Sequence, residues 1–357
     1  MVSVKHEITK GRGATLQIEG RFESVARERI DDGWGTADEE LPPFKTTVTV
    51  ESAKSIIVRQ ASPDLPFSLS LNGYRGCEHG CIYCYARPSH GYLNLSPGLD
   101  FETKLFAKPE AAKLLRAELA KPSYVCSPIA LGANTDHYQP VEREWKITRQ
   151  IVEVLAECKH PFSIVTKSSL IERDLDLLTQ MARDDLVQVI ITVTSLDAEV
   201  ARKLEPRAPS PRRRLQTIQR LNEAGVPCAV MVAPVIPFLT DAELENILQA
   251  AYEHGARSAN YVLLRLPHEV KDLFKDWLAV HYPLKAEHVM SRVHEMRGGK
   301  ENDSEFGARF RGQGLFADLL AKRFQLACER MGFNREPMSL DTSKFIRPNL
   351  SGQGSLF

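Results

Sequence analysis

Short runs of apolar, often β-branched residues alternate with amphipathic segments through the middle of this 357-residue chain. Runs that are nearly continuously apolar are typical of parallel strands packed between helices and a core. We expect six such strands, within residues 67–74, 123–133, 162–168, 187–195, 227–236 and 259–267. The segments between them have helical character. They cover residues 109–121, 145–159, 174–184, 210–225 and 240–255.

Capping residues mark the ends of these predicted helices. Ser210 precedes Pro211 as a helix N-cap, and Gly225 and Gly255 stand where C-terminal glycines belong. Six strands that alternate with helices predict an α/β fold, a parallel barrel or partial barrel. In such barrels the chemistry gathers at the C-terminal ends of the strands.

The segments before and after this alternation follow other patterns. Residues 1–60 are mixed, with one strand-like run, KTTVTVES, and we expect an N-terminal extension that wraps around the core. Residues 61–285 would form the core. Residues 286–357 would form a C-terminal helical segment: a mobile loop, RGGKENDSEFGARFRGQG, then a helix from Leu315 to Met331 and a tail.

Composition and charge limit the kinds of protein that this chain can be. The chain is 43% hydrophobic and 26% charged, as in an ordinary soluble protein. Lys and Arg number 46, as do Asp and Glu, so attraction to a nucleic acid or a membrane would have to be local. No apolar run is long enough to span a bilayer and the N-terminus has no signal-peptide core, so we expect a cytoplasmic protein without a membrane partner.

The candidate chemistry lies in the stretch GCEHGCIYCYA, residues 76–86, which follows the first predicted strand. It holds three of the seven cysteines, Cys77, Cys81 and Cys84, with the spacing C-x3-C-x2-C. An odd cysteine count with three so close argues against disulfides and for metal chemistry. Thiolates favour zinc, copper(I) or iron–sulfur clusters.

Two kinds of metal site compete for these cysteines. A structural zinc site usually has four ligands in two pairs, and here His79 or His90 would have to complete the set. A cubane iron–sulfur cluster held by three cysteines leaves one iron open for a substrate or cofactor. We favour the open cubane because the sequence has no second ligand pair.

The stretch, with aromatic Tyr83 directly before the last cysteine, resembles the signature of the radical S-adenosylmethionine (radical SAM) enzymes. The resemblance implies a partial (β/α)6 TIM-type barrel and a [4Fe–4S] cluster on Cys77, Cys81 and Cys84, whose open iron binds SAM. In that family an electron cleaves SAM to a 5′-deoxyadenosyl radical, which abstracts a hydrogen atom from the substrate. An external electron donor such as flavodoxin or ferredoxin is implied as a partner.

Within that family, NGYRGCEHGCIYCYARPSH, GANTDHYQPVER and IVTKSSLIERDLDLL are similar to the "DNA repair photolyase-like" subfamily related to spore photoproduct lyase. The resemblance spans roughly residues 67–265 and implies a lyase-like or repair reaction on a DNA or nucleotide lesion. Tyr85 matches a tyrosine that takes part in hydrogen transfer in that lyase, so we expect it to be catalytic. The lyase's hydrogen-donor cysteine aligns with Ala133, where this chain departs from the pattern.

The resemblance also implies where SAM binds. Asn134 and Thr135 end the second predicted strand, where family members bind the methionine amino group, and Asp136 lies beside them. The same residues are equally typical of a strand-ending Asx turn. Lys167 ends the third predicted strand, and the methionine carboxylate is its natural partner unless it is an ordinary surface lysine.

Further residues for SAM lie after the fourth predicted strand. Thr192 and Ser195 close that strand and are expected to meet the ribose hydroxyls. The arginines at 212–214 fall in the first turn of a predicted helix, where cations oppose the helix dipole. This placement indicates an anionic partner: the SAM carboxylate, through Arg207 or one of the three, or a nucleic-acid phosphate. A solvated arginine-rich surface is the alternative.

The last five residues, Gln353 to Phe357, resemble the short motif by which bacterial repair and replication proteins dock to the sliding clamp. An apolar Leu-Phe pair can insert into a pocket while the glutamine bonds at its rim. Two other functions fit the sequence. One is radical SAM modification of tRNA, a peptide or a small metabolite, and the other is a non-catalytic, metal-stabilised nucleic-acid-binding module.

Overall fold

A seven-stranded sheet forms the centre of the computed structural model, which describes residues 10–22, 45–336 and 339–349. Its strand order is β10-β9-β8-β7-β6-β3-β2. The first six of these pair in parallel. In chain order they are β3 (Leu69–Leu71), β6 (Ile129–Leu131), β7 (Phe162–Thr166), β8 (Val187–Thr192), β9 (Cys228–Val235) and β10 (Ser258–Leu263). Each overlaps one predicted strand.

The sheet remains open. β10 is one edge, and at the other edge β2 (Ile57–Arg59) pairs antiparallel with β3. Six parallel strands in sequential order with two separate edges form a partial barrel rather than a closed one. The predicted fold class is therefore confirmed.

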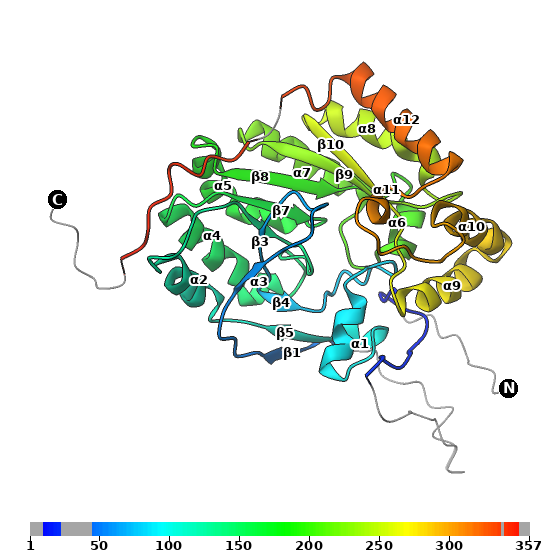
Figure 1. Cartoon of the computed structure of the whole chain (residues 1–357), viewed down its shortest axis with the longest axis horizontal. Coiled ribbons are helices and arrows are strands. Elements are labelled where there is room, and N and C mark those ends of the chain that lie inside the picture. Colours follow the sequence, from blue (N-terminus) through cyan, green and yellow to red (C-terminus); the bar gives the residue numbers. More distant parts are fainter. Residues whose placement is uncertain (1–9, 23–44, 337–338, 350–357) are drawn as a thin grey trace, which may run out of the picture.

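Helices link successive parallel strands and flank the sheet (Figure 1). Each of the five long ones lies inside its predicted segment. They are α2 (Ala111–Leu119), α4 (Ile147–Glu157), α5 (Leu175–Ala182), α7 (Pro211–Glu223) and α8 (Leu244–Glu253). Shorter helical segments sit at the strand ends. These are the 3-10 segments Arg87–Leu93, Ser169–Asp174 and Asp241–Glu243, and α1 (Leu99–Thr103), α3 (Glu142–Trp145) and α6 (Ala198–Leu204).

A second, three-stranded sheet lies beside the barrel (Figure 1). Its order is β1-β5-β4, formed by β1 (Thr47–Val50), β5 (Lys104–Ala107) and β4 (Tyr74–Arg75). β1 is the strand predicted in KTTVTVES. Residues 10–22 pack nearby, where Ala14 is buried and Thr15 donates a 2.5 Å hydrogen bond to Asp276.

The C-terminal region is helical, as expected. It contains α9 (Val270–His281), α10 (Pro283–Met296), α11 (Ala308–Arg311) and α12 (Leu315–Met331). The bounds of α12 are those predicted, whereas α11 is a short helix inside the segment that was predicted to be a loop. The division into three segments stays a prediction, although the boundary after residue 285 falls inside α10. None of the helices in the described residues is long and apolar enough to cross a membrane.

Residues 339–349 run back beside α5 and α4, at the left of the view in Figure 1. The Ile346 amide donates to the Cys158 carbonyl at 2.8 Å, and the Asp341 amide donates to the Asp185 carbonyl at 2.9 Å. Cys158 and Asp185 precede β7 and β8, so this segment lies at the N-terminal ends of the strands. Gln353 to Phe357 lie outside the described residues, and clamp docking stays a prediction.

Candidate active site

The three cysteines lie in an irregular loop after β4. Cys77 and Cys81 are each 7% exposed, and Cys84 is half-buried. Two glycines with positive φ, Gly76 and Gly80, allow the loop to fold so closely. Gly76 has φ +75°, and a Cβ there would lie 2.8 Å from the Phe101 carbonyl oxygen. Residues 76–84, called the cysteine loop below, are thus packed directly against α1.

A buried arginine, Arg87, binds the backbone of the cysteine loop. Arg87 is fully buried and forms an ion pair with Glu102, with Nη2 2.5 Å from Oε1. Its other donors reach four backbone carbonyls, those of Gly80, Cys81, Pro97 and Gly98. All five N–H donors of a guanidinium are therefore used, two of them on the cysteine loop itself.

Glu102 also holds the N-terminal segment. Its carboxylate accepts hydrogen bonds from the amides of Gly13 and Ala14, both at 2.9 Å. A Cβ at position 13 would lie 1.8 Å from the Gly80 carbonyl oxygen, so only glycine permits this crossing. We call residues 12–14 the strap, because they pass directly over the cysteine loop.

A second buried carboxylate, Glu205, positions Tyr83. It accepts hydrogen bonds from the hydroxyls of Tyr83 and Thr194 and pairs with the Arg214 guanidinium. Burial alone raises the pKa of this carboxyl, but Arg214 and then Lys167 lower it to about 2. Glu205 is consequently charged at neutral pH, and Tyr83 is fixed in the core beside the last cysteine.

A third carboxylate, Asp136, joins the cysteine loop to two strand ends. It lies 3.3 Å from Nδ1 of His79 and accepts from the Lys167 amide at 2.9 Å and the Thr166 hydroxyl at 2.7 Å. Burial raises the pKa of Asp136, but His79 and these donors bring it well below the ordinary value. Its acceptors are already used by the protein, which indicates a positioning role.

Two polar groups at the neighbouring strand ends remain without such partners. The Thr135 hydroxyl is buried and has no hydrogen-bond partner within the described residues. In that same part of the chain the ammonium of Lys167 has no carboxylate partner and lies 5.9 Å from the centre of the Tyr83 ring. Asn134 and Thr135 donate their amides to the Asn72 side chain at 3.2 and 3.3 Å.

These groups suit the cluster and SAM that the sequence predicts. Burial raises the pKa of the Cys81 thiol to about 12, and Lys167 opposes this, so a buried thiolate here needs a cation beside it. The Thr135 hydroxyl and the Lys167 ammonium, which lack such partners among the described residues, suit a zwitterionic methionine group. No three His, Cys, Asp or Glu side chains in residues 10–22, 45–336 and 339–349 are arranged to hold a single metal ion. The three cysteines as cluster ligands stay a prediction.

The other predicted SAM residues contact the protein itself. The Ser195 hydroxyl donates to Glu243 at 2.6 Å. Thr192 is buried, and its carbonyl accepts from Arg214 at 3.1 Å. Arg207 lies 3.1 Å from Glu78 of the cysteine loop. Their contacts with SAM stay predictions.

The anionic partners expected for the arginines at 212–214 are carboxylates of this chain in two cases. Arg213 pairs with Glu172 at 2.6 Å, and Arg214 pairs with Glu205. The expectation of an external anion is therefore wrong for these two, because each guanidinium already has an internal counter-ion.

Tyr85 connects the cysteine loop to the end of β6. Its hydroxyl donates to the carbonyl of Ala133, and its side chain is 49% exposed. The Arg265 guanidinium lies 5.8 Å from the centre of its ring. The structure thus brings together Tyr85 and Ala133, the two positions that the resemblance relates to hydrogen transfer.

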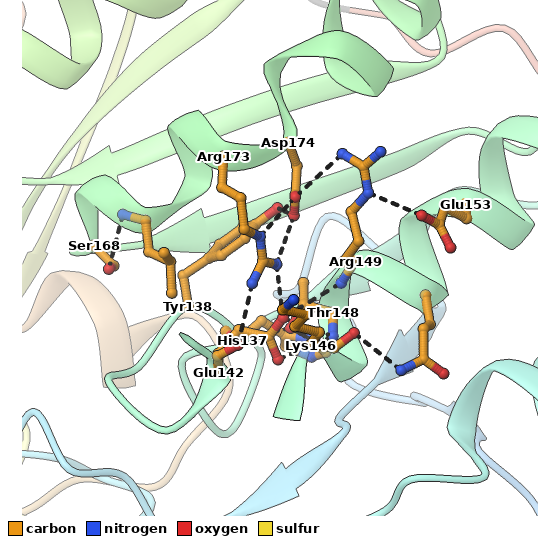
Figure 2. A network of polar contacts seen from close by, with 12 residues as sticks. His137, Tyr138, Glu142, Lys146, Thr148, Arg149, Glu153, Ser168, Arg173 and Asp174 are labelled. Atoms are coloured by element: carbon orange, nitrogen blue, oxygen red, sulfur yellow. Dashed lines mark hydrogen bonds and ion pairs between the residues drawn. The ribbon is translucent and has the colours of Figure 1, made fainter. Parts of the chain in front are cut away.

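A separate polar network explains the residues that follow GANTD in the sequence. Arg173 bridges the buried carboxylates of Glu142 and Asp174, both at 2.8 Å (Figure 2). The Tyr138 hydroxyl donates to Asp174 at 2.9 Å. This network joins the loop after β6 to the segment after β7. The segments HYQPVER and IERD therefore stabilise the structure at these strand ends.

Sequence reasoning missed Arg87, Glu102 and Glu205, and it weighed His79 only as a zinc ligand. One signal was available for Glu205, which is the only acid in the basic segment ARKLEPRAPSPRRR. Glu102 gave no signal, because its partners are the strap and Arg87, which no local pattern connects to it.

The described structure is that of an open α/β barrel protein with a three-cysteine loop at the C-terminal end of its sheet. The radical SAM superfamily model matches residues 71–251, half of the chain. The chain belongs to the radical SAM superfamily and is a radical SAM enzyme.

Relatives extend this similarity across bacteria and archaea. Uncharacterized proteins of Mycobacterium tuberculosis and Mycobacterium bovis are 40% identical over 234 residues, which is 65% of this chain and 68% of theirs. An uncharacterized protein of Methanocaldococcus jannaschii is 28% identical over 173 residues, 48% of this chain and 62% of its own.

Solved structures of spore photoproduct lyase share the fold. The complex with a dinucleoside spore photoproduct has a TM-score of 0.59 and 14% identity, covering 80% of each chain. A variant of that lyase with bound AdoMet and the same dinucleoside has a TM-score of 0.57. At this identity the likeness establishes the fold alone.

The Arg87–Glu102 pair leads to a first prediction. Glu102→Gln keeps the side chain's size but leaves the buried guanidinium without its counter-ion, so the free energy of unfolding should fall by roughly 3–5 kcal/mol in urea titrations. Glu110→Gln is the control, because Glu110 pairs with Lys113 on the surface at 3.0 Å. That change should cost less than about 1 kcal/mol. Equal losses would refute the anchoring role of the buried pair.

Glu205 should make stability depend on pH. Its folded pKa of about 2 lies below the ordinary 4.5, so its contribution is complete above the ordinary value and is lost as the pH falls toward 2. The shift corresponds to about 3 kcal/mol. The difference in free energy of unfolding between wild type and Glu205→Gln should therefore shrink as urea titrations move from about pH 7 to about pH 3. A difference that stays constant over this range would rule out a charged, buried Glu205.

Proposed function

We propose that this enzyme holds a [4Fe–4S] cluster on Cys77, Cys81 and Cys84, cleaves SAM reductively, and acts on a lesion or modified nucleotide in a nucleic acid. The observation that carries the cofactor assignment is the combination of a buried cysteine loop with two polar groups at adjacent strand ends. Within the described residues the buried Thr135 hydroxyl has no hydrogen-bond partner, and the half-buried Lys167 ammonium has no carboxylate partner. A flavodoxin or ferredoxin would supply the electron.

When bound, the cluster and SAM supply a 5′-deoxyadenosyl radical for hydrogen abstraction. The chain's own residues do the binding and the orienting. Lys167 would pair with the methionine carboxylate, and Asn134 and Thr135 would accept hydrogen bonds from the methionine amino group. Tyr83, whose hydroxyl is held by Glu205, would close one side of the site and exclude water. Thr192, Ser195 and Arg207 are the proposed further contacts to SAM.

The nucleic-acid part of the proposal is supported by the lyase-like fold and by Tyr85. A solved spore photoproduct lyase structure contains a dinucleoside spore photoproduct. In this chain the phenol of Tyr85 lies against the carbonyl of Ala133. Tyr85 is thus the proposed hydrogen-transfer residue, at a site where alanine stands in place of the lyase's donor cysteine. We expect the substrate to differ from the lesion of that lyase for this reason.

The cofactor assignment is tested by anaerobic reconstitution. Wild type should contain iron and sulfide, show a brown chromophore, and release 5′-deoxyadenosine from SAM after reduction with dithionite. Cys81→Ala should lose the chromophore and this product, whereas Cys228→Ala, which changes a buried cysteine in β9, should keep both. One zinc per chain without sulfide would overturn the proposal in favour of a metal-stabilised binding module.

Lys167→Met tests the SAM site separately from the cluster. Loss of a charge-assisted hydrogen bond should raise the dissociation constant for SAM about 10- to 100-fold in equilibrium dialysis, with iron and sulfide content unchanged. Lys159→Met is the matched control, because Lys159 pairs with Asp184 at 3.0 Å near the opposite ends of the strands. Unchanged SAM affinity in Lys167→Met would remove Lys167 from the site.

A further inference from the structure

Arginine and aromatic side chains alternate in a continuous series beside the cysteine loop. The Arg265 guanidinium lies 5.8 Å from the ring centre of Tyr85 and 4.8 Å from that of Phe310. The Arg309 guanidinium lies 4.7 Å from the ring centre of Phe310 and 5.1 Å from that of Phe306. We call these five residues the arginine–aromatic ladder.

The ladder extends from the cysteine loop to the C-terminal region, and both of its ends are exposed. Tyr85 directly follows Cys84, Arg265 lies two residues after β10, and Phe310 and Arg309 belong to α11. α11 contacts β10, beside which it lies in Figure 1. Tyr85 and Phe306, at the two ends of the ladder, are 49% and 61% exposed.

The two arginines differ in their electrostatic partners. Arg309 pairs with Asp64, with Nε 2.7 Å from Oδ2. Arg265 has no carboxylate partner in the described part of the chain, and its buried Nε has no hydrogen-bond acceptor there. A half-buried guanidinium without a counter-ion is unfavourable on its own, which indicates that an anion completes it in the bound state.

We infer that the arginine–aromatic ladder binds a single-stranded segment of nucleic acid and leads one of its nucleotides toward Tyr85. The inference rests on the proposed function and specifies the form of its substrate. Exposed aromatic rings stack with bases of any sequence, and a guanidinium pairs with phosphate in two parallel hydrogen bonds. A polymer that alternates bases and phosphates can therefore use the exposed rings of Tyr85 and Phe306 for its bases and Arg265, the guanidinium that Asp64 does not neutralise, for a phosphate.

A single strand suits the ladder better than a duplex. Rings stack only on bases that are unpaired or turned out of a helix, and the chemistry proposed here needs a nucleotide that is accessible beside the cysteine loop. The chain as a whole has no net charge, so the attraction must come from a local feature such as Arg265. A small metabolite would occupy one contact of the ladder and leave the rest unused.

The test measures binding by fluorescence anisotropy of the full chain with four labelled probes: a short DNA single strand, the RNA of the same sequence, the DNA duplex and poly-glutamate. Wild type should bind a single strand more tightly than the duplex. Arg265→Gln and Phe306→Ala should each weaken this binding about 10-fold or more. Arg265→Gln should also reduce the slope of log affinity against log salt by about 0.7. Comparing the dissociation constants of the DNA and RNA single strands shows which of the two nucleic acids the protein prefers.

Two matched controls make these losses specific. Arg257→Gln removes an arginine that stacks on Tyr252 at 4.4 Å before the start of β10, at the strand's other end. Leu284→Ala removes a side chain that is 93% exposed. Both should bind like wild type. Phe306 is itself exposed, so its variant separates loss of binding from loss of folding.

Three results would overturn the ladder as a nucleic-acid surface: duplex bound as tightly as single strand, Arg265→Gln behaving like Arg257→Gln, or poly-glutamate bound with the same dependence on Arg265. The binding assay needs neither cluster nor SAM. Release of 5′-deoxyadenosine without single-strand binding would refute the ladder alone. Single-strand binding without any 5′-deoxyadenosine would refute the proposed enzyme function alone.

Discussion

The Arg87 side chain is fully buried, and all five of its N–H donors form hydrogen bonds within the protein. It ties the backbone of the cysteine loop to Glu102, and Glu102 ties both to the strap. A buried ion pair adds little net stability compared with apolar packing, but it tolerates few alternative arrangements. The irregular loop that carries the thiols is therefore held by side-chain contacts to its backbone in place of regular secondary structure.

Two further buried carboxylates also tie the cysteine loop to other segments of the chain. Glu205 fixes Tyr83 against the core, and Asp136 joins His79 to the ends of β6 and β7. Each acid accepts hydrogen bonds from at least two segments that are remote in sequence. The site's acidic residues thus serve as anchors, and the groups left for ligands are neutral or cationic: three thiols, the Thr135 hydroxyl and the Lys167 ammonium. Such a set complements a cofactor that carries a carboxylate.

The strands and helices of the barrel could be predicted from the sequence because the patterns that specify them are local. Buried parallel strands leave nearly continuous apolar runs, and Ser210 or Gly225 marks a helix end within a few residues. The cysteine spacing is local too. By contrast, Glu102 meets Gly13 across 89 positions, and Tyr83 meets Glu205 across 122. No periodic pattern encodes such contacts. For the same reason Arg213 and Arg214 were expected to await an external anion, when their partners are acids of this chain.

The strap also makes the covering of the cysteine loop depend on how much of the chain has been synthesised. The carboxylate that receives the Gly13 amide is added 89 residues after that glycine. All three thiols lie in the interval between Gly13 and Glu102. During translation the three cysteines are therefore complete before the strap has its acceptor, and the strap can take its place over them only once Glu102 has been added.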